Sequence, residues 1–208
     1  MRQNTTKHLY SYWNEVRGAR MAPRRFDIEP AQIASILPET FVLERCADGQ
    51  FRFRLAGTRI CESFGREFRG LRMLDLWPPA DQPALEELLA GSMQLGGVGV
   101  IDFAANPEQN IQITCEVLLL PLLHTGNEVD RVLGSFAMAE QPYWLGVTPL
   151  VELSTREINV IWPDGRPFPM NSCQDGQTPL LSHPPYSRLV TSDRRSFRVY
   201  DGGLSKDR

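Results

Sequence analysis

The sequence has no hydrophobic run long enough to cross a membrane. The longest, Val117–Leu123, is interrupted by Pro121 and falls far short of the ~20 apolar residues that a membrane-spanning helix needs. The N-terminus, MRQNTTKHLYSYW, lacks the apolar core and the small-residue cleavage site of a secretory signal. We therefore expect a cytoplasmic protein without a membrane partner.

Residues that form disulfides or bind metals are also scarce. The chain of 208 residues has 4 cysteines and 3 histidines. The cysteines are widely separated, at Cys46, Cys61, Cys115 and Cys173. They show neither a CxxC pair nor a disulfide framework, which is typical of a reducing compartment. Neither residue type clusters at the spacing of a zinc site, so we expect no metal.

Catalytic motifs are missing as well. Glu62, Ser63, Glu67 and Asp75 lie near one another, but they form neither a nucleophile–base triad nor a recognisable carboxylate pair. We interpret them as capping and surface residues. The glycine-rich stretch at 96–99 is not followed by the Lys-Ser/Thr of a phosphate loop. We therefore expect no enzymatic activity.

The overall charge is close to balanced. A formal net charge of -3 and a pI near 5.7 disfavour nucleic-acid binding across the whole surface. The N-terminal segment is nevertheless basic, with Arg2, Lys7, Arg17, Arg20, Arg24 and Arg25 against the acid Glu15. We interpret this segment as a solvated face, with an anionic partner as the alternative.

The chain opens with a strongly amphipathic helix. Its apolar side chains, spaced at i, i+3, i+4 and i+7, are Leu9, Tyr12, Trp13 and Val16. This stripe packs either on its own domain or on the helix of a partner in a dimer, and the sequence does not decide between the two. A second helix begins at Pro30, and together they form a helical flank over residues 1–38.

A core with alternating strands and helices follows over residues 39–140. Strand-like alternation on either side of Asp48-Gly49 predicts a hairpin, Phe41–Cys46 with Gln50–Ala56, in which Phe51, Phe53 and Leu55 share a face. Helical patterns then lead to Met93. Three strands come next, predicted at Val98–Ala104, Ile111–Leu123 and Arg131–Ala139.

This order predicts an α+β fold. We expect a five-stranded antiparallel sheet with helices on one face, in which the first and last strands lie side by side in the middle. Residues 141–208 form a proline-rich, partly disordered tail. Within it, Leu150–Trp162 is either a short helix or a strand, Pro163–Pro185 is loop or disorder, and Phe197–Tyr200 is a small docked strand.

Two stretches carry a family resemblance. They are LYSYWNEVRGARMAPRRFDIEPAQIASILP and FRFRLAGTRICESFGREFRGLRMLDLW. Both are similar to a bacterial PAS-like family formerly catalogued as a domain of unknown function, and the resemblance covers roughly residues 7 to 140. It implies the PAS fold and a sensory or signalling role without enzymatic activity.

The resemblance to PAS domains also allows cofactor-binding motifs to be looked for in the sequence. The GxNCRFLQ-like motif of flavin-binding PAS domains is missing, because Cys61 lies in RICESF and is better read as a buried core thiol. The predicted helix Asp81–Met93 lacks the histidine that haem-binding PAS domains use there. We therefore expect no bound cofactor.

A PAS fold offers a place for a pocket beneath its short helices. The residues that would line it are Phe53, Leu55, Ile60, Cys61, Phe64, Leu74 and Trp77, with Phe136 or Leu133 from the last strand. A solid, close-packed core is the alternative that we favour. Arg59 and Arg66 suit an anionic head group, with a solvated surface or an ion pair to Glu62 as the alternative.

Three hypotheses for function follow. The first is a cytoplasmic PAS-type signalling module without its own output domain, acting by protein–protein contact as a homodimer or an adaptor through the stripe around Trp13. The second is a sensor with a pocket for a small apolar or acidic ligand. The third, and weakest, is an unrecognised enzyme.

Overall fold

The computed structural model describes residues 1–106, 112–124, 126, 128–140, 142–165, 190–192 and 195–201. The N-terminal half holds α1 (Asn4–Arg17), η1 (Arg25–Asp27), η2 (Pro30–Ile33), η3 (Leu37–Glu39), β1 (Thr40–Arg45), β2 (Phe51–Ala56), α2 (Thr58–Phe64), η4 (Met73–Leu76), α3 (Gln82–Ala90) and η5 (Ser92–Leu95). The strands β3 (Val98–Asn106), β4 (Ile113–Leu123), β5 (Val129–Met138), β6 (Glu152–Trp162), β7 (Val190–Ser192) and β8 (Arg195–Asp201) follow. None of the helices in these ranges is long and apolar enough to span a lipid bilayer.

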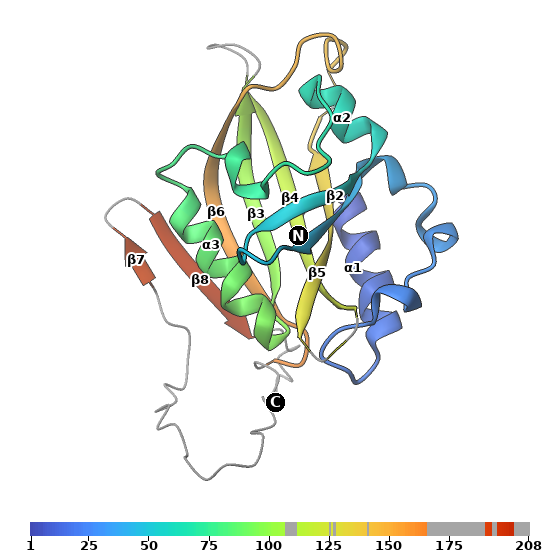
Figure 1. Ribbon diagram of the computed structural model, residues 1–208. Helices are drawn as coiled ribbons and strands as arrows, with labels where there is room; N and C mark the ends of the chain where they lie inside the picture. Colours follow the sequence, from blue (N-terminus) through green and yellow to red (C-terminus); the bar gives the residue numbers. More distant parts are fainter. Residues whose placement is uncertain are drawn as a thin grey trace, which may run out of the picture.

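One sheet runs through the described chain in the order β2-β1-β5-β4-β3-β6-β8-β7 (Figure 1). The first five strands pair antiparallel, and β1 lies beside β5, so the predicted α+β fold and its closure are confirmed. The prediction of five strands was too low. β6 pairs antiparallel with β3, and β8 runs parallel to β6.

The ambiguous segment Leu150–Trp162 is therefore mostly strand, and the tail is not wholly irregular. Leu153, Ile158, Val160 and Trp162 bury their side chains in the same core as the inner residues of β3. This burial and the pairing with β3 decide for a strand where local periodicity is ambiguous. The predicted loop Pro163–Pro185 lies outside the described residues beyond position 165.

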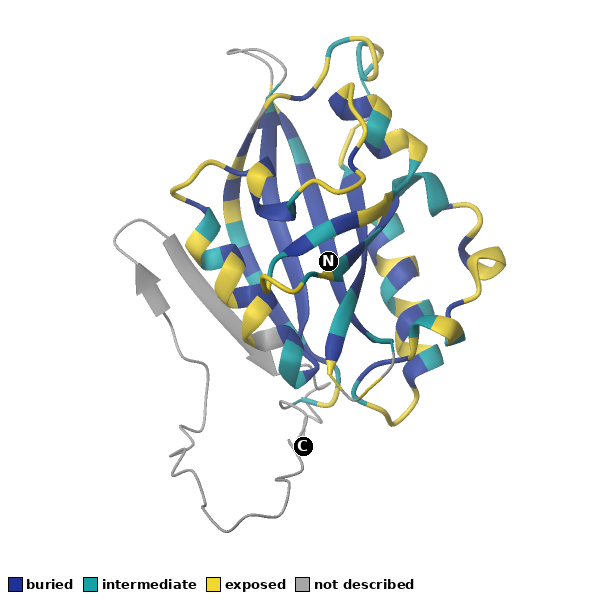
Figure 2. Cartoon of the chain, viewed as in Figure 1, coloured by how far each residue is buried: buried dark blue, intermediate teal, exposed yellow. Residues whose placement is uncertain are grey.

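The core helices lie on one face of the sheet, as predicted, and the N-terminal helical flank covers the other face. α2, η4 and α3 cover the inner face and enclose the larger core. α1 lies across β4 and β5 on the outer face, where it encloses a second core. Figure 2 shows buried residues running along the middle strands between these two layers.

A β-bulge on β2 reverses one predicted orientation. Leu43 lies opposite Phe53, whereas Val42 lies opposite Leu55, so Arg54 is an extra residue in the ladder. A one-residue slip moves the following side chain to the other face of a strand. Leu55 accordingly leaves the face of Phe53 and is 55% exposed, so it does not line the inner core.

Candidate functional site

The inner core is built around a chain of aromatic rings. Seven rings touch edge to face, with centroids 4.9–5.9 Å apart, in the order Phe41, Phe53, Phe68, Phe64, Phe136, Phe103 and Trp77. This inner aromatic chain links β1, β2, α2, β5 and β3 to the residue that follows η4. Each such contact adds about 0.5–1.5 kcal/mol beyond the burial of area. The rings therefore hold the layer of short helices on the sheet.

Most of the predicted pocket residues meet in this core. Six of them are buried in it, namely Phe53, Ile60, Phe64, Leu74, Trp77 and Phe136, and Cys61 packs against it half-buried. Leu55 faces the other way. Arg59 is about half exposed, and its guanidinium binds the Glu39 carboxylate, so the predicted pairing with Glu62 is replaced by a partner on η3.

Sequence reasoning missed three members of the aromatic chain. Phe41 and Phe103 alternate with other apolar residues in their strands, so their side of the sheet depends on strand pairing that one strand alone does not reveal. Phe68 lies between two short helices and carries no periodic signal. The Arg66 guanidinium lies over its ring, 5.4 Å from the centroid, instead of facing a pocket.

Two polar side-chain groups that border this core have no hydrogen-bond partner among the described residues. The Trp77 side chain is 2% exposed, and its indole N–H has no acceptor among the described residues. The Thr155 hydroxyl, on a residue 8% exposed, has no partner there either. Both residues flank Phe103, since Thr155 lies opposite it on β6 and the Trp77 ring contacts it. A buried unpaired group costs about 1–3 kcal/mol, so each of these two groups weakens the core that surrounds Phe103.

The cysteines of the described core are poor nucleophiles. Burial, with the charge of Glu67 adding to it, raises the pKa of the Cys61 thiol. Burial raises the pKa of Cys115 to about 12. A thiol that stays protonated neither attacks nor binds metals readily. No group of three or more His, Cys, Asp or Glu is placed to hold a metal ion within the described ranges.

The outer face holds the predicted partner stripe. Leu9 and Trp13 are completely buried, and they pack with Leu118, Leu120 and Leu133 of the sheet. The Trp13 indole N–H donates to the Pro121 carbonyl at 2.9 Å.

The other two residues of the stripe are half-buried. The Tyr12 hydroxyl accepts from the Glu29 amide at 2.7 Å, and Val16 packs against the edge of the same core. Within the single chain, the outer face of the sheet therefore supplies the apolar cover of the stripe.

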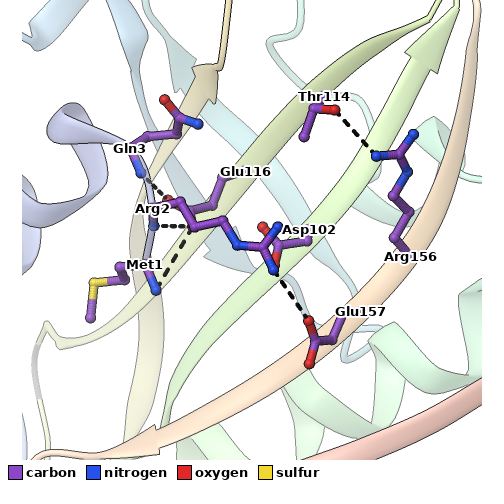
Figure 3. A network of polar contacts seen from close by, with 8 residues as sticks. All are labelled: Met1, Arg2, Gln3, Asp102, Thr114, Glu116, Arg156 and Glu157. Atoms are coloured by element: carbon purple, nitrogen blue, oxygen red, sulfur yellow. Dashed lines mark hydrogen bonds and ion pairs between the residues drawn. The ribbon is translucent and has the colours of Figure 1, made fainter.

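A carboxylate from the sheet caps the start of α1. Glu116, 1% exposed on β4, accepts from the Arg2 amide at 2.7 Å and from the Gln3 amide at 3.2 Å (Figure 3). Amides at the start of a helix lack partners within it, and the positive end of the helix dipole favours an anion. Gln3, at the N-cap position, makes no cap with its own side chain, so Glu116 takes that role.

Three acids lie in a row beneath this helix start. Asp102 on β3 lies directly opposite Glu116 on β4 and opposite Glu157 on β6. Arg2 reaches over them, 3.7 Å from Asp102 and 3.8 Å from Glu157 (Figure 3). Burial raises the pKa of Asp102; Arg2 opposes this, and the charges of Glu116 and Glu157 add to it. The row therefore makes the docking site of α1 sensitive to charge.

The other end of α1 is held by a buried arginine. Arg17, 4% exposed, binds both carboxylate oxygens of Asp164, at 2.7 and 3.1 Å, just beyond β6. It also donates to Asn14 Oδ1 and to the Arg20 carbonyl, and its guanidinium lies 5.6 Å from the centre of the Trp13 ring. Arg17 therefore does not belong to the solvated basic face that we predicted for it.

Comparison with known proteins agrees with this architecture. A family model described as a PAS domain matches residues 1–137. No curated protein matches the chain. The matched region includes α1 and ends within β5. The strand β6, which contains Glu157, and the following residue Asp164 therefore lie beyond it.

Proposed function

Because the chain belongs to the PAS domain family, whose members are typically sensory rather than catalytic, we propose that this sensory or signalling module acts through protein–protein contact made by α1. Docked on the sheet, α1 hides its apolar stripe. Undocked, it presents Leu9, Tyr12, Trp13 and Val16 to a second copy or to a signalling partner.

The observation that carries this proposal is that α1 belongs to its own core. Leu9 and Trp13 lie in the outer cluster, whereas the inner aromatic chain lies on the opposite face of the sheet. α1 can therefore leave while α2 and α3 stay in place. The released stripe has the spacing of a helix that packs on another helix.

Buried polar groups favour release. Thr6 on α1 and Ser135 on the outer side of β5 are both completely buried, and neither hydroxyl has a partner among the described residues. Each unpaired group costs the docked state about 1–3 kcal/mol. Such a cost brings the docked and undocked states closer in free energy, as a switch requires.

The test loosens both ends of α1 while keeping its stripe. Glu116→Ala combined with Asp164→Ala removes one support from each end. We expect faster amide exchange across residues 4–17 and a particle mass, by light scattering, that rises with concentration above that of the wild type. Adding Trp13→Ala should abolish the rise. Fast exchange with an unchanged mass would contradict the proposal.

A ligand sensor is the second candidate, and the Trp77 indole favours it. A small molecule with a hydrogen-bond acceptor would satisfy the N–H of Trp77, and a polar group on it would reach the Thr155 hydroxyl. The apolar and aromatic surroundings suit a compact, largely apolar ligand.

Native mass spectrometry of gently purified protein tests this second candidate. We expect an adduct on the wild type that is lost in Trp77→Phe, since phenylalanine keeps the ring but has no N–H. A wild-type spectrum without an adduct, together with no thermal shift across a metabolite collection, would reject it.

A further inference from the structure

The Glu39 carboxylate binds helices from both faces of the sheet. It lies at the end of η3, just before β1, and its side chain is 13% exposed. One oxygen accepts from the Thr5 hydroxyl of α1 at 2.5 Å, and the other binds the Arg59 guanidinium of α2. The outer-face helix and an inner-face helix are thus bonded to the same residue.

The α2 helix is pressed closely against η3. The Gly57 amide, at the N-cap of α2, donates to the Thr40 carbonyl at 2.8 Å. A Cβ on Gly57 would lie 2.3 Å from the Pro38 carbonyl oxygen and 2.5 Å from that of Leu37, so the backbones meet with no room for a side chain. A shift of α2 therefore moves η3, and with it Glu39.

The same helix is tied to the inner aromatic chain. Phe64, the last residue of α2, contacts Phe68 and Phe136 with ring centroids 5.3 and 5.2 Å apart. Rearrangement of these rings has to displace α2, because well-packed interiors transmit strain instead of absorbing it. The contacts run from the inner rings through α2 and Glu39 to Thr5.

We propose that Glu39 is a positioning residue that couples the inner core to the docking of α1. Arg59 orients the carboxylate, and the oriented carboxylate receives Thr5 and holds the first turn of α1 on the sheet. The coupling gives the proposed function its regulation, and it rests on that function for its biological meaning. Its physical basis, an energetic link between Arg59 and α1, is measurable separately.

The competing interpretation is that both bonds are independent surface contacts. Arg59 is about half exposed, and ion pairs of this kind contribute little by themselves. Independent contacts predict additive effects, so that loss of Arg59 loosens α2 alone. Coupling predicts that loss of Arg59 loosens α1, with which it shares Glu39.

Hydrogen–deuterium exchange on the full chain separates the two. We expect Arg59→Ala to speed exchange in peptides covering residues 4–17 by about two- to fivefold, the range that corresponds to an exposed charge-assisted contact. Arg54→Ala is the matched control, because Arg54 also pairs with a glutamate, Glu44, but lies on β2. It should leave α1 unchanged.

The decisive comparison uses Thr5→Val, which keeps the shape of the side chain and removes its hydroxyl. In that background Arg59→Ala should not speed the exchange of α1 any further, because the hydrogen bond from Thr5 to Glu39 is already lost. In the protein that keeps the native Thr5, Arg59→Lys should retain part of the exchange protection of α1 that Arg59→Ala loses. Exchange in β4 peptides reports global unfolding and should not change.

Unchanged α1 exchange in Arg59→Ala would overturn the coupling. The coupling would also be overturned if Arg59→Ala changed the exchange of α1 equally in the wild-type background and in the Thr5→Val background. These outcomes are distinguishable from failure of the proposed function, because that test measures particle mass in variants that leave Glu39, Thr5 and Arg59 intact.

Discussion

Arg17 and Asp164 join α1 to the end of β6 through a bidentate pair, across 147 positions of the chain. Arg17 lies inside the region matched by the PAS family and Asp164 lies beyond it. The helix that we propose as the signalling element is therefore held by a strand that lies outside the matched region.

Removing Asp164 should destabilise the protein. Asp164→Ala leaves the Arg17 charge buried with fewer partners, at a cost of about 1–3 kcal/mol in the free energy of unfolding. Asp75→Ala is the control, because its pair with Arg72 is an i,i+3 surface contact at 3.7 Å that contributes less than about 0.5 kcal/mol. Urea unfolding of both variants measures the difference, and equal losses of unfolding free energy would contradict a stabilising role of the Arg17–Asp164 pair.

The buried indoles of Trp13 and Trp77 should respond differently to the same change. Trp13→Phe loses the hydrogen bond to Pro121 as well as volume. Trp77→Phe also loses volume, but it removes an N–H that has no acceptor in the described part of the chain. We expect the loss for Trp13→Phe to exceed that for Trp77→Phe by about 1 kcal/mol. Chemical denaturation of the two variants decides, and a larger loss at Trp77 would show that its N–H has a partner.

Stability should depend on pH through Asp102. Its pKa is raised in the folded state, mainly by burial, so the folded protein binds this proton more tightly than the unfolded chain does. The stabilising contribution is complete below the unfolded pKa of the carboxyl and is lost as pH rises through the folded pKa. The free energy of unfolding of Asp102→Asn should therefore rise relative to that of the wild type as pH rises through that window. Parallel curves of unfolding free energy against pH for the two proteins would contradict this role of Asp102.

Gly134 should not tolerate a side chain. A Cβ there would lie 2.2 Å from the Phe41 ring and 2.7 Å from the Leu118 carbonyl oxygen. We expect Gly134→Ala to cost about 1–3 kcal/mol, because the ring at the start of the inner aromatic chain has to move. Gly126→Ala, whose Cβ would meet nothing closer than the Glu128 amide nitrogen at 4.0 Å, is the control. Thermal unfolding midpoints compare the two.

Sequence reasoning succeeded where local pattern and global fold agree. The hairpin around Asp48-Gly49, the order of the first five strands and most of the inner core followed from alternation and turn residues. It went wrong where a second segment decides the outcome. The side on which Leu55 lies depends on the bulge against β1, and the partner of Arg59 is Glu39 from another element instead of the neighbouring Glu62.

The docking of α1 lies between these cases. Its stripe was evident from Leu9 and Trp13, but an apolar stripe does not reveal which surface covers it. No sequence pattern indicates that Glu116 caps α1, because an acid inside a strand is usually exposed and its partner lies more than a hundred positions away.

The pairing of β6 with β3 has a practical consequence for aggregation. A fragment cut at residue 137, where the family match ends, would expose the full β3 edge, from Val98 to Asn106, as a row of open hydrogen-bonding groups. Long apolar edges of this kind recruit strands from neighbouring chains and seed cross-β assemblies. β6 thus keeps each molecule from becoming a template for the next.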